Sequence, residues 1–169
     1  ADLILAMPGT EGIELEEGFV ESISLPNVSL RAGKFLSAFG KHNALHTHAY
    51  PFIDAPVTQE RLLGGEGLNE VGVRASFLLP FSWFSELNLE LLDGENEIFS
   101  SEGSEDFAYV GNLKSLWDLS DESTLELGGS LAAGKNASGK QSRIAGSDLT
   151  LKWQSTGQVK RNLSIRGEY

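Results

Sequence analysis

The sequence contains no cysteine, which excludes disulfide bonds, cysteine-ligated zinc or iron–sulfur sites and thiol catalysis. Basic residues are also few, because 13 lysines and arginines stand against 24 aspartates and glutamates, and the formal charge is -11. A chain of this sign repels the phosphate backbone, so we expect no nucleic-acid partner. No apolar run approaches the roughly 18 residues that a membrane-spanning helix needs. The 169 residues are enough for one ordinary domain.

Apolar and polar residues alternate along most of the chain, which predicts β-strands with one apolar and one polar face. The stretch from Asn69 to Leu79 is the clearest example, and the alternation returns at 28–33, 86–91, 107–119, 125–131, 148–153 and 163–169. No stretch keeps the spacing of an amphipathic helix, so we expect helices to be minor. We count about eight strands, or nine with 1–6. Glutamates break the pattern within 13–25, where we expect a bulge.

Short and long connections take turns along the chain. Turn residues mark short links at 25–27, 80–82, 120–122 and 155–160, whereas 37–67, 93–106 and 134–146 read as long loops. This asymmetry is typical of transmembrane β-barrels, and Trp83, Phe84, Trp117 and Trp153 lie near the short turns, as an interfacial girdle would. A lipocalin-like barrel or a sandwich, with the leucines inside, is the soluble alternative.

We therefore predict an all-β fold, an antiparallel up-and-down transmembrane β-barrel of which about eight or nine strands are present. Residues 1–169 are expected to form one porin-like domain that belongs to a larger barrel and continues beyond both ends, with 37–67 as a long extracellular loop. The charged residues of the polar face are the predicted pore lining, and their opposing charges would set selectivity: Arg74, Glu86, Glu90, Lys114, Glu126, Asp148, Lys152 and Arg166.

The three histidines of the chain all fall within seven residues of this long loop, and a carboxylate follows. Imidazole is a common zinc ligand, and residues two apart in an extended segment project to the same side, so His42, His46, His48 and Asp54 could form a metal site. The other interpretation, which the irregular spacing favours, is that the loop folds over or into the barrel mouth and the histidines hydrogen-bond there. No nucleophile elbow, phosphate cradle or helical carboxylate pair accompanies them, so we expect no enzyme and no required cofactor apart from zinc in the first interpretation.

One ordered set of residues resembles a known family: Arg31, Gly33-Lys34-Phe35, Phe39-Gly40, Asn43, His46-Thr47-His48, Phe52-Ile53-Asp54, Pro56, Gly64-Gly65-Glu66-Gly67-Leu68 and Phe77-Leu78-Leu79-Pro80. It is similar to bacterial porin-superfamily outer-membrane proteins labelled zinc-regulated TonB-dependent outer membrane receptors. The resemblance covers nearly the whole chain and is most specific from Arg31 to Pro80. It implies a Gram-negative outer-membrane barrel, and it carries His46, His48 and Asp54 over as candidate metal ligands.

The expected function is passage or uptake of small solutes, including zinc or other metal ions, across the outer membrane. The expected partners are outer-membrane lipid, the solutes themselves, TonB for the full-length protein, and further copies in a homo-oligomer as porins form. The alternatives are a non-conducting metal-binding or scaffolding outer-membrane barrel and a soluble β-barrel binding module.

Overall fold

The computed structural model describes residues 2–6, 16–46, 49–50, 56–64, 67–96, 98–100, 106–156 and 161–169. These residues form nine strands and one short helix: β1 (Asp2–Ala6), β2 (Glu17–Leu25), β3 (Val28–Leu36), α1 (Val57–Leu63), β4 (Asn69–Leu78), β5 (Phe84–Leu92), β6 (Ala108–Ser120), β7 (Ser123–Lys135), β8 (Gln141–Gln154) and β9 (Asn162–Glu168). Within this part of the chain, no helix is long and apolar enough to cross a membrane.

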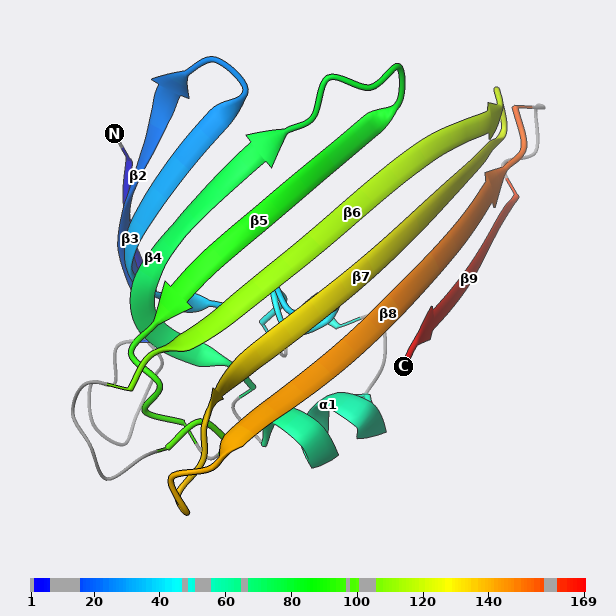
Figure 1. The fold of residues 1–169 in the computed structure, drawn as a ribbon. Helices are drawn as coiled ribbons and strands as arrows, with labels where there is room; N and C mark the ends of the chain where they lie inside the picture. Colours follow the sequence, from blue (N-terminus) through cyan, green and yellow to red (C-terminus); the bar gives the residue numbers. More distant parts are fainter. Residues whose placement is uncertain are drawn as a thin grey trace.

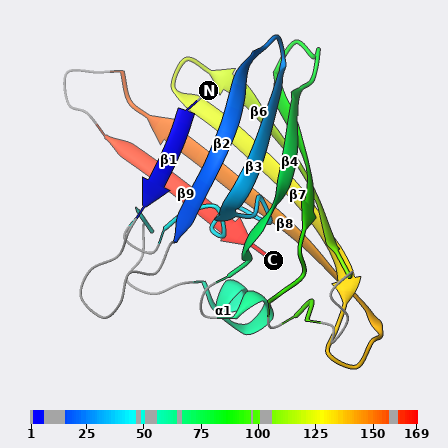
Figure 2. The same cartoon turned by 90° about the vertical axis from the view of Figure 1, so that its left-hand side faces the viewer.

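The strands form a single sheet in which each strand pairs with its sequence neighbours, from β1 to β9. All eight ladders are antiparallel. The prediction of an all-β, antiparallel, up-and-down fold with minor helices is thereby confirmed. The sheet curls strongly (Figures 1 and 2), but over the described residues no ladder joins β1 to β9, so it is open.

The two rims differ, because the turns at one end are tight and most connections at the other are long. Figure 1 shows the tight turns at the top and the long connections, with α1, at the bottom. One predicted loop is wrong: β7 runs to Lys135 and β8 begins at Gln141, so the connection is 136–140 rather than 134–146. The expected irregularity in β2 is confirmed as a shift of register between Ser22 and Leu25.

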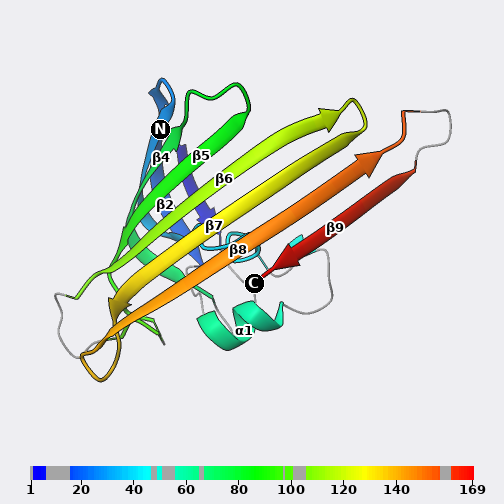
Figure 3. The ribbon, with the colours of Figure 1, turned by 45° about the vertical axis from the view of Figure 1, so that its right-hand side comes forward.

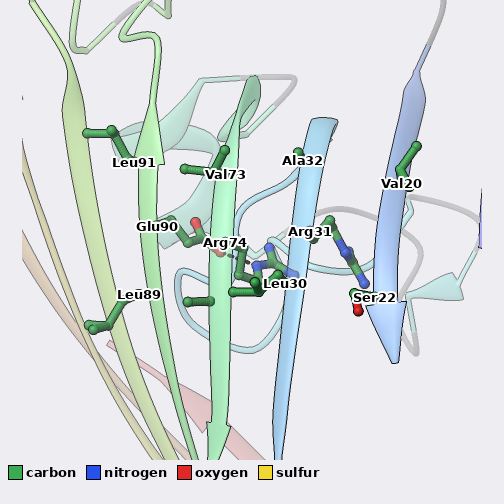
Figure 4. A pocket seen from close by; sticks show the side chains of 11 residues that line it. Val20, Ser22, Leu30, Arg31, Ala32, Val73, Arg74, Leu89, Glu90 and Leu91 are labelled. Carbon is green, nitrogen blue, oxygen red and sulfur yellow. Dashed lines mark hydrogen bonds and ion pairs between the residues drawn. The ribbon is translucent and has the colours of Figure 1, made fainter. Parts of the chain in front are cut away.

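The sheet exposes the face that carries apolar side chains and buries much of the face that carries polar ones, which is the reverse of a water-soluble domain. Apolar side chains of one face are exposed, by 39–67%, and we call this the apolar face: Val20, Leu30, Val71, Val73, Leu89, Tyr109, Leu113, Leu127, Leu131, Leu149, Leu163 and Ile165. The opposite, concave side is the polar face, and several of its side chains are buried: Asn88, Glu90, Asn112, Ser130, Asp148 and Thr150. In Figure 4, Val73 and Leu91 leave their strands on one side, whereas Arg74 and Glu90 leave on the other.

A small apolar core lies inside the curve of the sheet, at the end of the long connections. Its largest fully buried members are Phe35, Leu68, Leu92 and Phe99, and they come from strands and connections alike. A strand such as β6 therefore places Ala108 and Val110 in this core and Asn112 and Lys114 farther along the same face. The interior is apolar near one rim and polar toward the other.

Aromatic side chains gather near the tight turns. The rings of Phe81 and Trp83 stack with centroids 5.0 Å apart, and Trp117 lies 6.1 Å from Trp83. Phe84 differs from the expected girdle, because the register places it on the polar face with Glu86, and Lys114 Nζ lies 5.8 Å from the centre of its ring. Successive side chains of a strand point to opposite faces, so a position near a tight turn does not by itself fix the face that a residue joins.

Candidate functional site: the polar face and the inner loop

The ladder registers place all eight predicted pore-lining residues on the polar face. Arg74 lies opposite Glu90, and Glu86 lies opposite Lys114, so charges of opposite sign meet across neighbouring strands. The two pairs differ in closeness, because Arg74 Nε is 2.5 Å from Glu90 Oε1 whereas Lys114 Nζ is 3.8 Å from Glu86 Oε1. The face therefore carries charges of both signs.

Residues 37–46, which we call the inner loop, run across the concave side of the sheet after β3. Figure 3 shows this segment in cyan behind the strands, within the curve of the sheet. Such a position exposes its backbone donors to the polar face, and strand side chains satisfy several of them. The loop narrows the space that the sheet encloses.

Glu90 anchors the beginning of the inner loop to β5. Its side chain has no exposed surface, and it accepts hydrogen bonds from Ser37 Oγ at 2.5 Å and Ala38 N at 2.8 Å as well as from Arg74. Arg74 also donates to the carbonyl of Leu36 at 2.7 Å and lies 4.7 Å from the centre of the Phe35 ring. The buried ion pair is thus fully hydrogen-bonded on the loop side, which is the condition under which such a pair is tolerated.

Asn43 holds the middle of the inner loop to the segment that leads into β4. Its Nδ2 donates to the carbonyls of Ser37 at 2.8 Å and Leu68 at 3.1 Å, and its Oδ1 accepts from Leu68 N at 2.8 Å. The side chain is 1% exposed. These three bonds replace the ladder contacts that an irregular backbone lacks, so the loop has a defined shape.

The inner loop then reaches β7 and β9. Gly40 N donates to Ser130 Oγ of β7 at 2.8 Å, and the Lys41 ammonium pairs with Glu126 on the same strand. His42 Nδ1 meets a carboxylate oxygen of Glu168 on β9. The loop therefore connects strands that are far apart in the order of the sheet.

The two described histidines contact carboxylates of different strands. His42 is 3% exposed and faces Glu168 on β9, whereas His46 Nε2 is 3.0 Å from Glu17 at the start of β2 and its Nδ1 is 3.5 Å from Glu16. Over the described residues, no group of three histidine, aspartate or glutamate side chains is arranged to hold a metal ion. His48 and Asp54, the other two candidate ligands, lie outside the described residues.

A cavity of about 390 Å³ lies between the polar face and the inner loop, and we call it the inner cavity. Five of the eight predicted pore-lining residues line it: Arg74, Glu86, Lys114, Glu126 and Asp148. Glu90 lies beside it as the partner of Arg74, while Lys152 lines a separate hollow at the tight-turn rim and Arg166 is exposed.

The sequence prediction omitted several residues of the inner cavity. Arg31, whose guanidinium lies 4.0 Å from the centre of the Phe19 ring and pairs with Glu21 at 2.9 Å, follows the same alternation as Arg74 and could have been included. Asn88 could have been found in the same way. Lys41 could not, because it belongs to the loop and its partner Glu126 is 85 residues away in the chain.

Comparison with known proteins finds a relative that matches nearly the whole chain. The chain is 34% identical over 195 residues to a protein of Aquifex aeolicus (strain VF5) that is described only as an uncharacterized protein, and the match covers 99% of this chain. The chain spans 41% of the length of that relative. No protein-family model matches the chain, and no solved structure matches it. The resemblance to porin-type and TonB-dependent receptors therefore stays a prediction.

Proposed function

We propose that this chain forms part of the wall of a Gram-negative outer-membrane β-barrel that lets small polar solutes pass. The observation that carries the proposal is the reversed burial of the sheet, in which Leu113 and Leu131 are 47% and 67% exposed while Glu90 and Asp148 are 5% and 6% exposed. Apolar surface in water costs free energy in proportion to its area, whereas the same surface against lipid costs none. A soluble binding module would leave this whole band in water.

The distribution of charge along the strands supports the same orientation. The apolar face of β4, β5, β6 and β9 carries no charged residue, and on the other well-described strands Lys34, Lys135 and Arg143 are its charged members. All three lie toward the rim of the long connections. This is the arrangement that a strand crossing the hydrocarbon layer requires, because charge is tolerated near the interfaces and costly at the midplane.

The inner loop determines what such a barrel would let through. It is anchored through Glu90, Asn43 and Glu168, so it would restrict the lumen rather than move freely in it. The remaining polar passage would be the inner cavity, lined by paired charges and amides. Small hydrophilic solutes fit this lining, because each displaced hydration bond can be replaced by a wall group.

A lysine substitution separates the membrane proposal from a soluble one. Leu113→Lys lies in the middle of β6 on the apolar face and should cost about 2–4 kcal/mol in a bilayer, whereas a change at an exposed site in water stays within about 0.5 kcal/mol. Leu119→Lys, near the tight-turn end of β6, is the control and should cost about 1 kcal/mol or less. Folding of the full-length protein into lipid vesicles, measured by urea titration, checks both. Equal stabilities for Leu113→Lys and the unsubstituted protein would contradict the membrane proposal.

Conductance across planar bilayers tests passage itself. The purified full-length protein should give stepwise conductance that depends on the inner loop. The second candidate is a scaffolding barrel that does not conduct. It is favoured by the apolar core of Phe35, Leu68, Leu92 and Phe99, because this core fills one end of the concave side and would block passage there. Correct membrane assembly without any conductance would support that second candidate and contradict the first.

The association with zinc is a separate proposal that rests on the histidine loop. His42 and His46 each contact a carboxylate, and a metal ion would have to compete with these pairs. Calorimetry with zinc on the full-length protein and on the double variant His46→Ala, His48→Ala tests the loop as a binding site. Equal heats for the two proteins would remove these histidines as ligands.

A further inference from the structure

Carboxylates outnumber cations by one when the groups that line the inner cavity are counted together with Glu90 beside it. Four cations line it, and each has a carboxylate partner: Arg31 with Glu21, Lys41 with Glu126, Arg74 with Glu90, and Lys114 with Glu86. Asp148 is the fourth carboxylate of the lining and, with Glu90 beside the cavity, the fifth in all. Within the described part of the chain, neither a hydrogen-bond donor nor an ion-pair partner is found for it.

Asp148 is nevertheless well buried, and its carboxylate packs against the neighbouring strand β7. It is 6% exposed, and its carboxylate lies over Gly128 of β7, where a Cβ atom would come within 2.6 Å of the carboxyl carbon. Gly128 is the cross-strand partner of Asp148. Because glycine has no side chain, it leaves the space that the Asp148 carboxylate occupies. The carboxylate is held against the wall and turned to the cavity.

The surroundings of Asp148 favour a positive ligand. The charged groups that act on it are two cations, Lys41 and Lys114, and two carboxylates, Glu126 and Glu168. Lys41 already pairs with Glu126, and Lys114 pairs with Glu86. A buried carboxylate without a donor carries a desolvation cost that a mobile cation can offset.

We propose that Asp148 is the cation-binding position of the inner cavity, so that the solutes which pass are preferentially small monovalent cations, alkali ions or primary ammonium groups. This inference rests on the proposed passage through the barrel. A monovalent ligand suits a single carboxylate in a cavity that neutral amides and hydroxyls also line, among them Asn88, Asn112 and Ser76.

Reversal potentials of the full-length protein in a bilayer with a KCl gradient measure the preference for potassium over chloride. Asp148→Asn keeps the size of the side chain and removes its charge, so the permeability ratio should fall about two- to fourfold, as expected for one charge several ångströms from the ion path in water. Lys114→Gln removes an opposing cation and should raise the ratio by a similar factor. Asp118→Asn is the matched control, because Asp118 faces the tight-turn hollow instead of the inner cavity, and it should leave the ratio unchanged.

Each outcome decides something different. Conductance with the same ratio in Asp148→Asn as in the unsubstituted protein overturns the cation site and leaves the proposed passage standing. A fully assembled protein without conductance overturns both. If Asp148→Asn does not assemble, which the shift in migration of the unheated protein on gels reports, the Lys114→Gln ratio decides alone, and an unchanged or lower value overturns the site. Repeating the gradient with methylammonium chloride distinguishes alkali ions from ammonium groups.

Discussion

Removal of the Glu90 charge should release the inner loop from the sheet. The Glu90 carboxylate accepts from Ser37 Oγ, Ala38 N and Arg74 Nε, and its side chain is fully buried. Glu90→Gln keeps the shape of the side chain but turns one oxygen into a donor group. With the amide oxygen in the place of Oε1, the new NH₂ group faces Ser37 Oγ, and the guanidinium of Arg74 loses its counter-charge.

The size of the effect follows from these contacts. Hydrogen bonds to a charged group contribute about 1.5–3 kcal/mol each; the two that Oε1 accepts become weaker bonds to a neutral amide oxygen, and Ser37 Oγ loses its carboxylate acceptor. Breaking a buried ion pair by removing one partner costs about 3–5 kcal/mol, because the other charge stays buried alone. We therefore expect Glu90→Gln to lower the free energy of unfolding by about 3–5 kcal/mol. Adding Arg74→Met should recover part of this loss, since no unpaired charge remains.

Urea titration of the protein in detergent micelles, followed by tryptophan fluorescence, measures the change. Glu86→Gln is the matched control, because its partner Lys114 is 3.8 Å away and both side chains are about one-third exposed, 31% and 39%. Such a pair contributes less than about 1 kcal/mol. Equal losses of unfolding free energy in Glu90→Gln and Glu86→Gln would show that Glu90 does not anchor the loop. A double variant Glu90→Gln, Arg74→Met that is less stable than Glu90→Gln alone would show the same.

Three further predictions concern stability. Hydrogen bonds from the backbone N–H of Thr156, and next from its hydroxyl, hold the pKa of Glu122 below its ordinary 4.5. These bonds therefore stabilise the folded protein fully above that pH, and the stabilisation is lost as the pH falls through the lowered pKa. A Glu122 carboxyl that titrates at or above 4.5 by NMR would contradict this. Gly33→Ala should cost about 1–3 kcal/mol in urea titrations, because φ is +136° and a Cβ would lie 2.6 Å from a neighbouring Cα, whereas Gly129→Ala, with open space around it, should change stability by less than about 0.5 kcal/mol. Asn43→Ala should cost about 2–3 kcal/mol and raise hydrogen exchange at Leu68 N, which loses its acceptor; unchanged exchange there would argue against the bond.

Alternation was enough to predict most of the strands and the common face of eight charged residues. The eight residues from Arg74 to Arg166 share one side because the side-chain period of a strand is two, whatever the surrounding fold. The connection between β7 and β8 was predicted too long because Gly134, Ser142 and Gly146 are small, so the pattern there carries little contrast in polarity.

The inner loop was beyond prediction in detail. Folding back into the barrel mouth was one of the two interpretations of the histidines, but the partners were not identified. The contacts of Lys41 and His42 span 85 and 126 residues, and no local pattern encodes a pairing at that distance. The excess carboxylate at Asp148 likewise becomes visible only when each cation has been matched to its partner in space.

The uninterrupted order of the strands bears on how such a protein can evolve. Because every ladder joins sequence neighbours, duplication or deletion of one hairpin leaves the other pairings intact and changes the girth by two strands. A lineage can thus widen or narrow its wall without inventing a new topology. The segment between β3 and β4 would then have to be refitted to each new diameter, so its length should vary with strand number among relatives.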